Sequence, residues 1–480
     1  MAWLSMPGRA HDQRTGARDI GGLVALALAA ALVGVALAGS AARFGPWTVL
    51  AVPVAVAVSA AVLRDLSWAV VAMFLLLPVG LRHVGPLQVV ELSALLVIAL
   101  VVAISVSDGR SWRLPLRVGL PLGAVLLVGA LSTAGSVDAE LSRSAFVQLA
   151  VGAGLMVAVS VSVDSTAQLR RLVSVLVVVG AGISIAAAST IGPVTVAYGG
   201  AAVSGRAQGI FAQPNELGAF TAAVVVLALG LWFGAHSRLA SFIAFVSVIA
   251  VLAALLSSLS RGGWIGAVAG ALAVIVMLAG QAHVRARLAG LGLALFALAV
   301  SATLLPGVDS LTGVIGSRIS SILDAGGNPN DARPEIYDEA VRQIFDKPLL
   351  GRGPGTFPTT YADTASTGRS GEAEHAHNIV LTLSTELGLL GLVAFAALAT
   401  AVLVSGWQAV RTLLRRGQGR DAALCAGALG ALVTVLGHGT IDYPLRNPTL
   451  FLVHWAMAGL VLGYVRVARA RRPAQAEARA

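Results

Sequence analysis

The chain has 480 residues, of which 57% are hydrophobic and only 12% are charged. Soluble proteins carry about 25% charged residues, so this composition excludes an ordinary soluble domain and indicates that most of the chain lies in lipid. The net charge of +10 does not indicate nucleic-acid binding, because the basic residues stand in short clusters between apolar runs, as they do in membrane proteins. The single cysteine, Cys425, excludes an intrachain disulfide and a cysteine-based metal site.

Apolar runs long enough to cross a bilayer recur along the chain. A membrane-spanning helix needs roughly 17 to 25 predominantly apolar residues. Fourteen runs meet this requirement, at 20–41, 46–63, 66–82, 88–107, 116–134, 145–163, 171–191, 217–235, 239–259, 262–280, 288–305, 379–407, 422–441 and 448–466. Only Arg64 and Asp65 separate the second run from the third, so these two are the least distinct. The pattern predicts an all-α polytopic membrane protein of about 12–14 transmembrane helices.

The arginines predict how these spans are oriented. With the N-terminus in the cytoplasm, the short segments on the cytoplasmic side hold 21 arginines and those on the other side hold 6. Cytoplasmic segments next to membrane spans carry the excess of basic residues. We therefore expect a multi-pass protein of the cell membrane with two cytoplasmic tails, 1–19 and 467–480. Between them lie helices 1 to 11 (20–305), one long loop outside the cytoplasm (306–378) and helices 12 to 14 (379–466).

The long loop has internal order. Residues 331–334 predict the start of a helix, because Pro334 would occupy the first turn, where proline is favoured. Ile336, Ala340 and Ile344 then recur at helical spacing on one side, and Lys347 and Pro348 close the pattern. We expect a short amphipathic helix on the membrane surface, followed by a glycine-rich turn at 351–355.

Three arginines fall on the expected outer side of the membrane. Arg206 precedes the span at 217–235 together with Asn215, Arg261 lies in a tight turn between two spans, and Arg333 begins the loop helix. Guanidinium groups recognise phosphate through paired hydrogen bonds, and a helix start adds backbone donors. If the three converge, they form a pyrophosphate site. The alternative for any single arginine is a membrane anchor or a structural ion pair.

Two histidines stand where the loop ends and the span at 379–407 begins. The positive end of the helix dipole disfavours imidazolium at His377, so the ring stays neutral and can accept a proton near pH 7. His375 lies two residues earlier and could take the same role. Glu386, further along this helix, is either functional or paired within the bundle. Asp442, at the outer end of the thirteenth span, is a candidate to brace the site.

Several common motifs are missing from the sequence. It contains no Walker A pattern, no dinucleotide-binding glycine fingerprint and no His-Glu-x-x-His metal helix. It also lacks an acidic pair spaced to hold a divalent ion beside a nucleotide sugar. We therefore expect neither a cofactor nor a metal, and a lipid-linked sugar donor fits an outward-facing site better than a cytosolic nucleotide sugar.

At these residues the sequence resembles the O-antigen ligase/polymerase family of bacterial glycan-transfer membrane proteins. The features that carry the resemblance are Ser260-Arg261-Gly262, Arg333, the run 346–355 with Arg352, His377-Asn378 followed by Gly388, and Arg206 with Pro214-Asn215. The resemblance covers roughly residues 200–445, whereas the first seven spans match only in hydropathy. Fourteen candidate spans exceed the twelve or so that are usual for the family.

The resemblance implies a glycosyltransferase of the C-type membrane architecture that needs no metal. Its donor would be a glycan linked to undecaprenyl pyrophosphate, which is held among the membrane lipids. Its acceptor would be a glycan, a lipid or a protein. Arg261 and Arg333 would hold the pyrophosphate and stabilise the charge that develops on it. His377 would deprotonate or position the acceptor hydroxyl for inverting attack on the anomeric carbon. The residues expected to bind substrate are Arg206, Asn215, Arg352, His375 and Asn378.

Two other functions compete with this interpretation. A protein O-oligosaccharyltransferase would share the same face and differ only in its acceptor, as polymerases and ligases also do. A transporter of a small anion or glycan precursor would show inverted repeats and broken spans with polar residues at mid-membrane. Here the polar residues gather at the outer edge and in one long loop, which favours an enzyme.

Overall fold

The computed structural model describes residues 58–109, 112, 114–191, 195–196, 202–203, 205–302, 333–364 and 375–470. Ten helices in this part of the chain are long and apolar enough to cross a membrane. They are α4 (Val89–Ser107), α5 (Leu116–Ala134), α6 (Ala139–Val161), α7 (Thr166–Ala187, continued by the 3-10 turn η3, Ala188–Thr190), α8 (Pro214–Phe233), α9 (Arg238–Ser257), α10 (Arg261–Leu278), α15 (Ile379–Arg415), α16 (Gly419–His438) and α17 (Pro448–Ala470). The predicted all-α polytopic membrane fold is therefore confirmed.

One predicted span is divided. The segment 66–82 forms a nine-residue helix, α3 (Ser67–Leu75), followed by the 3-10 turn η2 (Leu77–Val79) and a hairpin of β1 (His83–Val84) and β2 (Leu87–Gln88). Asp65 pairs with Arg171 at the start of α7, whereas Gly80 lies beside Thr449 at the start of α17, so α3 and η2 together run between the two ends of the bundle. Pro78 cannot continue the helical hydrogen bonding and stands at the start of η2. The run predicted at 20–41 and most of 46–63 lie outside the described residues.

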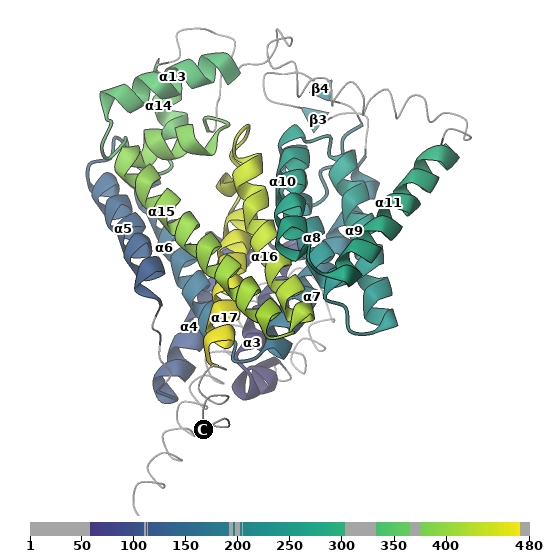
Figure 1. Ribbon diagram of the computed structural model, residues 1–480. Coiled ribbons are helices and arrows are strands. Elements are labelled where there is room, and N and C mark those ends of the chain that lie inside the picture. The colour runs from purple at the N-terminus through teal and green to yellow at the C-terminus, as the bar shows by residue number, and fades with distance from the viewer. Residues whose placement is uncertain are drawn as a thin grey trace, which may run out of the picture.

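The helices have a central group and a periphery (Figure 1). In α8, α16 and α17, between 78% and 89% of the spanning window is buried inside the protein, compared with 28% in α5. Small residues allow the central helices to approach closely, as is common in membranes. A Cβ placed on Gly427 of α16 would lie only 2.7 Å from the Cα of Gly230 of α8. Side chains on the peripheral helices, such as Leu116 and Phe242, are exposed.

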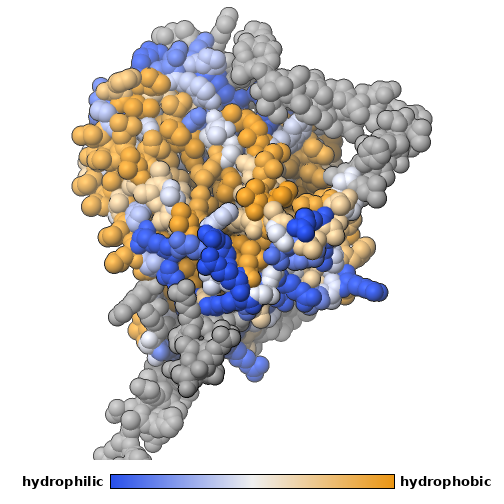
Figure 2. Space-filling view, viewed as in Figure 1, coloured by the Kyte–Doolittle hydropathy of each residue, from blue (hydrophilic) through white to orange (hydrophobic). Residues whose placement is uncertain are grey.

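The surface has the polarity expected of a membrane protein. The face seen in Figure 2 has a broad hydrophobic band across its middle, with hydrophilic side chains above and below it. The upper polar end carries α13 (Arg333–Asp346) and α14 (Phe357–Thr364), and α17 ends toward the lower end (Figure 1). α11 (Ala282–Ala302) covers most of the run predicted at 288–305.

The predicted amphipathic loop helix is present as α13. Its side chains Ile336 and Ala340 are buried together with Phe357 and Tyr361 of α14 and with Ala376. α14 itself was not predicted. This small apolar cluster, separate from the main core, holds the loop segment 375–377 beneath the two loop helices and so fixes where α15 begins.

α15 has a sharp bend at Gly388, whose φ of 69° lies in the left-handed region that favours glycine. The bend frees backbone groups of α15 to pair with the glycine-rich turn of the loop. Leu389 N donates to Pro348 O (2.8 Å), and Gly353 N donates to Glu386 O (3.0 Å). A Cβ on Gly388 would overlap the Leu349 carbonyl. Gly388, ten residues after Asn378, thus marks the place where the loop docks on α15, two to three turns into the helix.

Candidate active site

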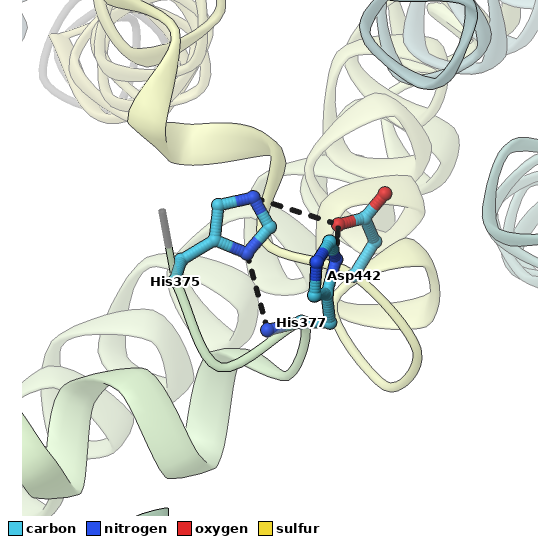
Figure 3. A group of neighbouring side chains, drawn as sticks. All are labelled: His375, His377 and Asp442. Atoms are coloured by element: carbon cyan, nitrogen blue, oxygen red, sulfur yellow. Dashed lines mark hydrogen bonds and ion pairs between the residues drawn. The ribbon is translucent and has the colours of Figure 1, made fainter. Parts of the chain in front are cut away.

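The core of the site is a hydrogen bond between His377 and Asp442 (Figure 3). His377 precedes α15 and Asp442 follows α16, and their Nδ1 and Oδ1 atoms are 3.0 Å apart. Both side chains are largely buried. Two further hydrogen bonds join the same segments: Ile379 N donates to Gly439 O, and Asn378 Nδ2 donates to Thr440 O. The pair therefore rests on a backbone junction between α15 and the segment after α16.

The local sequence dictates the geometry at His377. Asn378 caps α15, because its side-chain oxygen accepts hydrogen bonds from Val380 N and Leu381 N, as asparagine commonly does at helix starts. His377 itself has a φ of 46°, which is unusual for a residue other than glycine. Such backbone strain persists only where surrounding contacts enforce it, and it is enriched at functional sites. The turn aims the imidazole at Asp442 instead of along the helix.

His375 stands next to the pair in a supporting position. Its Nδ1 accepts a hydrogen bond from His377 N (3.1 Å), so in the neutral ring the proton lies on Nε2, which is 3.9 Å from Asp442 Oδ1. Burial lowers the pKa of His375 to about 3, and the charges of His377, Arg446 and Arg333 act in the same direction. The ring is therefore neutral at physiological pH, with its accepting nitrogen engaged by the backbone.

Asp442 joins the histidines to a second set of polar side chains. Its Oδ2 accepts a hydrogen bond from Asn215 Nδ2 (3.0 Å), and Asn215 Oδ1 accepts one from Arg206 Nη2 (2.6 Å). Arg206 is buried and also donates from Nε to Ser258 O (2.7 Å). Burial raises the pKa of the Asp442 carboxyl, but the hydrogen bond to His377 and the nearby ring of His438 outweigh it and hold this pKa well below its usual range. Asp442 is thus an anion.

Arg261 and Arg333 both lie close to this network. Arg261 begins α10, and the backbone beside it packs on His438: a Cβ on Gly262 would lie 2.8 Å from the His438 ring. His438 Nε2 in turn lies 3.7 Å from Asp442 Oδ2. Arg333 begins α13 one turn before Tyr337, whose hydroxyl donates to the His377 carbonyl (3.3 Å). Residues four apart on a helix share a face, and the Arg333 charge acts on His375.

Arg352 occupies a different place. Its Nη2 is 2.7 Å from Asp346 Oδ2, and its backbone N donates to Thr385 O. Glu386 lies beside the same turn, where its carboxylate accepts a hydrogen bond from Gly355 N (2.8 Å). Of the two roles left open for Glu386, these contacts fit a structural one. Both residues secure the loop against the bend of α15, below the histidine pair.

Four contributors were missed or underrated by sequence reasoning. Asp442 is the centre of the network, although it lies 65 residues from His377 along the chain. His438 and Tyr443 flank it, and the Tyr443 ring centroid is 5.9 Å from that of His375. Arg446 adds positive charge close enough to act on His375. The signal available in the sequence was the cluster of polar residues at 438–446 between two apolar spans, since such groups are costly at a membrane boundary.

The site contains a possible set of metal ligands. His375, His377 and Asp442 each offer one ligand atom, and these atoms lie within 4.8 Å of one another. Two imidazoles and a carboxylate are a donor set that zinc or another transition metal accepts. In the arrangement described here, however, His375 Nδ1 is engaged by the backbone of His377 and His377 Nδ1 by Asp442.

The His377–Asp442 arrangement can accept a proton at the imidazole, next to the Asp442 carboxylate anion. With Nδ1–H donated to Asp442, the neutral His377 ring carries its lone pair on Nε2, the atom that can take a proton. The carboxylate fixes this tautomer and stabilises the imidazolium that forms, as in other His–Asp pairs. Arg333 supplies positive charge that acts on His375, and Arg261 begins the helix whose next residue, Gly262, packs on His438.

The fold and the site define a polytopic α-helical membrane protein with a histidine–carboxylate pair at one end of its helical bundle. Residues 245–396 match the family model described as O-antigen ligase. The match covers about a third of the chain, and over these residues the chain is similar to that family. The matched region contains Arg261, Arg333, Arg352 and both histidines, whereas Arg206, Asn215 and Asp442 lie outside it. No curated protein matches the chain.

Proposed function

We propose that the protein transfers a glycan from a polyprenyl-pyrophosphate carrier, undecaprenyl pyrophosphate in bacteria, to an acceptor hydroxyl. The single observation that carries this proposal is the His377–Asp442 pair, held at 3.0 Å. Arg333 acts on the adjacent His375, and α10, which begins with Arg261, packs on His438. A base with its orienting carboxylate and a set of guanidinium groups are the two parts that such a transfer requires. The family match supports the general class of reaction.

The chemical step is a displacement at the anomeric carbon. His377 Nε2 takes the proton of the acceptor hydroxyl while the hydroxyl oxygen forms a bond to the anomeric carbon. The bond between that carbon and the pyrophosphate oxygen breaks, and its electron pair leaves with the polyprenyl pyrophosphate. Attack from the side opposite the leaving group inverts the anomeric configuration. The imidazolium is stabilised by Asp442 until it loses its proton to water.

The arginines stabilise the leaving group in this proposal. Negative charge grows on the pyrophosphate as the glycosidic bond breaks, so cations fixed in advance lower the barrier. Arg261 and Arg333 take this role because each begins a helix next to the histidine pair. Arg206 and Asn215 position Asp442 through their hydrogen bonds. Asn378 orders the start of α15, and Arg352 secures the loop.

We further propose that the reaction needs no metal ion. Because the arginines supply the positive charge, a cation held by His375, His377 and Asp442 would occupy the base instead of assisting it. Prolonged dialysis of the protein against a chelator is expected to leave the transfer rate unchanged. Loss of activity on chelation, restored by zinc or manganese, would contradict this part of the proposal.

The orientation follows from the arginine distribution, with both termini in the cytoplasm and the site on the outer face of the cell membrane. Many arginines near the end of the bundle opposite α13 support it, among them Arg411, Arg415 and Arg469. Accessibility of single cysteines introduced at Ser136 and at Gly417 would test it. The proposal expects an impermeant thiol reagent to label only Cys at position 136 from outside the cell.

The direct test uses purified protein, a polyprenyl-pyrophosphate glycan and candidate acceptors. The proposal expects a new glycosidic product of inverted configuration and an equal amount of released polyprenyl pyrophosphate. Movement of the glycan carrier across a vesicle membrane without any product would instead favour the transporter. Glycans of a deletion strain separate the acceptors: lost chain length indicates a polymerase, lost attachment to lipid a ligase, and lost protein glycans a protein transferase.

A further inference from the structure

A second polar hollow lies at the end of the bundle opposite the histidine pair. It is formed where α5 begins and where α15 and α17 end, and its volume is about 270 Å³. Four arginines line it, Arg117 from α5, Arg411 and Arg415 from α15, and Arg469 from α17, together with Gln408 and Thr412. Figure 2 shows hydrophilic side chains below the apolar band at this end of the molecule.

The lining is positively charged. Among its described residues there is no Asp or Glu, so the lining offers no carboxylate to Arg117, Arg411 and Arg415. Like charges that line one hollow repel, and an anion bound among them reduces the repulsion. The geometry of Arg117 is fixed in advance, because its Nη1 donates to Gln408 Oε1 (2.6 Å) across the boundary between α5 and α15. Its buried Nε has no hydrogen-bond partner among the residues that the structure describes.

The surroundings of the hollow indicate the source of that anion. Exposed apolar side chains stand beside it on the same two helices: Leu116 and Leu120 on α5, and Val404 and Trp407 on α15. Tryptophan is typical of the level at which lipid headgroups meet acyl chains. A phospholipid can therefore place its phosphate among the arginines while its acyl chains lie along these side chains. Basic pockets between spans at the cytoplasmic side bind such headgroups.

We propose that this arginine pocket binds the phosphate of an anionic phospholipid. The lipid would bridge the beginning of α5 and the ends of α15 and α17. The proposal is independent of the glycan-transfer chemistry, because it uses none of the residues of the histidine site. If the pocket does not bind lipid, the proposed glycan transfer is unaffected. If the glycan transfer is disproved, the proposed lipid binding is unaffected.

The test measures thermal stability and lipid retention of the purified, delipidated protein in detergent. Phosphatidylglycerol should raise the Tm of the wild-type protein and stay bound in native mass spectra, whereas phosphatidylcholine should do neither. The double variant Arg411→Gln/Arg415→Gln should bind phosphatidylglycerol roughly tenfold to thirtyfold more weakly. The matched control Arg238→Gln/Arg285→Gln, which removes two exposed arginines elsewhere, should bind it like the wild type.

Three outcomes would overturn the proposal: equal stabilisation by phosphatidylcholine, unchanged binding by the double variant, or a full effect of inorganic phosphate alone. The last outcome would assign the pocket to a free anion instead of a lipid. If the double variant is unstable even without lipid, Arg411→Glu takes its place, since Arg411 is exposed and its replacement does not disturb packing. Retained phosphatidylglycerol affinity in that variant would equally overturn the proposal.

Discussion

The two ends of α15 carry charge in different ways. Just before its first residue, His377 belongs to a network in which the Asp442 anion lies among side chains from three segments, those of His377, Asn215 and His438. At its last turns, Arg411 and Arg415 line a hollow that has no acidic side chain among its described residues. A network with an internal anion fixes the position and tautomer of a base, which suits chemistry. A set of cations without such an anion suits binding.

Asp442→Asn, at the histidine end of α15, is expected to cause the largest loss of transfer rate. An amide in place of the carboxylate donates a hydrogen bond to His377 Nδ1, so the ring proton moves to Nε2 and the base is lost. We expect the transfer rate to fall about 10³–10⁴-fold while the protein still folds. The measurement is the rate of product formation by purified protein. Asp346→Asn, which changes an exposed carboxylate paired with Arg352, is the control and should stay near the wild-type rate.

Arg333→Ala removes one of the two cations assigned to the leaving group. Loss of one such donor costs about 10²–10³ in the catalytic rate. Arg342→Ala serves as the control. Arg342 lies on the same helix, is exposed and pairs with Glu339. A rate for Arg333→Ala equal to that of Arg342→Ala would exclude Arg333 from the site.

Gly388→Ala tests whether the bend of α15 supports the histidine end. A Cβ there would overlap the Leu349 carbonyl, and the φ of 69° disfavours any side chain. We expect a loss of about 3 kcal/mol of stability, seen as a lower Tm. Gly182→Ala in α7, where a Cβ has open space, should be neutral or slightly stabilising. Equal Tm values for the two variants would show that the loop does not dock tightly on the bend.

His375→Gln is expected to change the pH dependence of stability more than the rate. The folded protein holds His375 neutral with a pKa of about 3, so below about pH 6.5 only the unfolded chain takes up this proton. Stability therefore falls as the pH falls, by about 1.4 kcal/mol per pH unit from this group. Asp442 is ionised in both states between about pH 7 and 5 and does not contribute there. Tm values should show a smaller decrease over this interval in His375→Gln than in His236→Gln, an exposed control.

The sequence was sufficient to predict the apolar spans that the structure describes, because hydropathy depends on local composition. It also placed the helix at Arg333–Asp346, from Pro334 and the spacing of Ile336 and Ala340. At 66–82 it did not show that the segment is divided into a short helix and a 3-10 turn at Pro78. The His377–Asp442 contact could not be derived, since nothing local couples residues 65 positions apart. For the same reason the sequence could not show that Arg206 reaches Asp442 through Asn215.

Product formation by His377→Ala tests the central claim most directly. The assay follows inverted glycosidic product from a polyprenyl-pyrophosphate glycan, with purified protein whose folding is checked by its Tm. The account predicts a loss of about 10²–10⁴-fold, with the wild-type rate retained by His236→Ala, which removes an exposed histidine remote from the site. A wild-type rate for His377→Ala would contradict the assignment of His377 as the base.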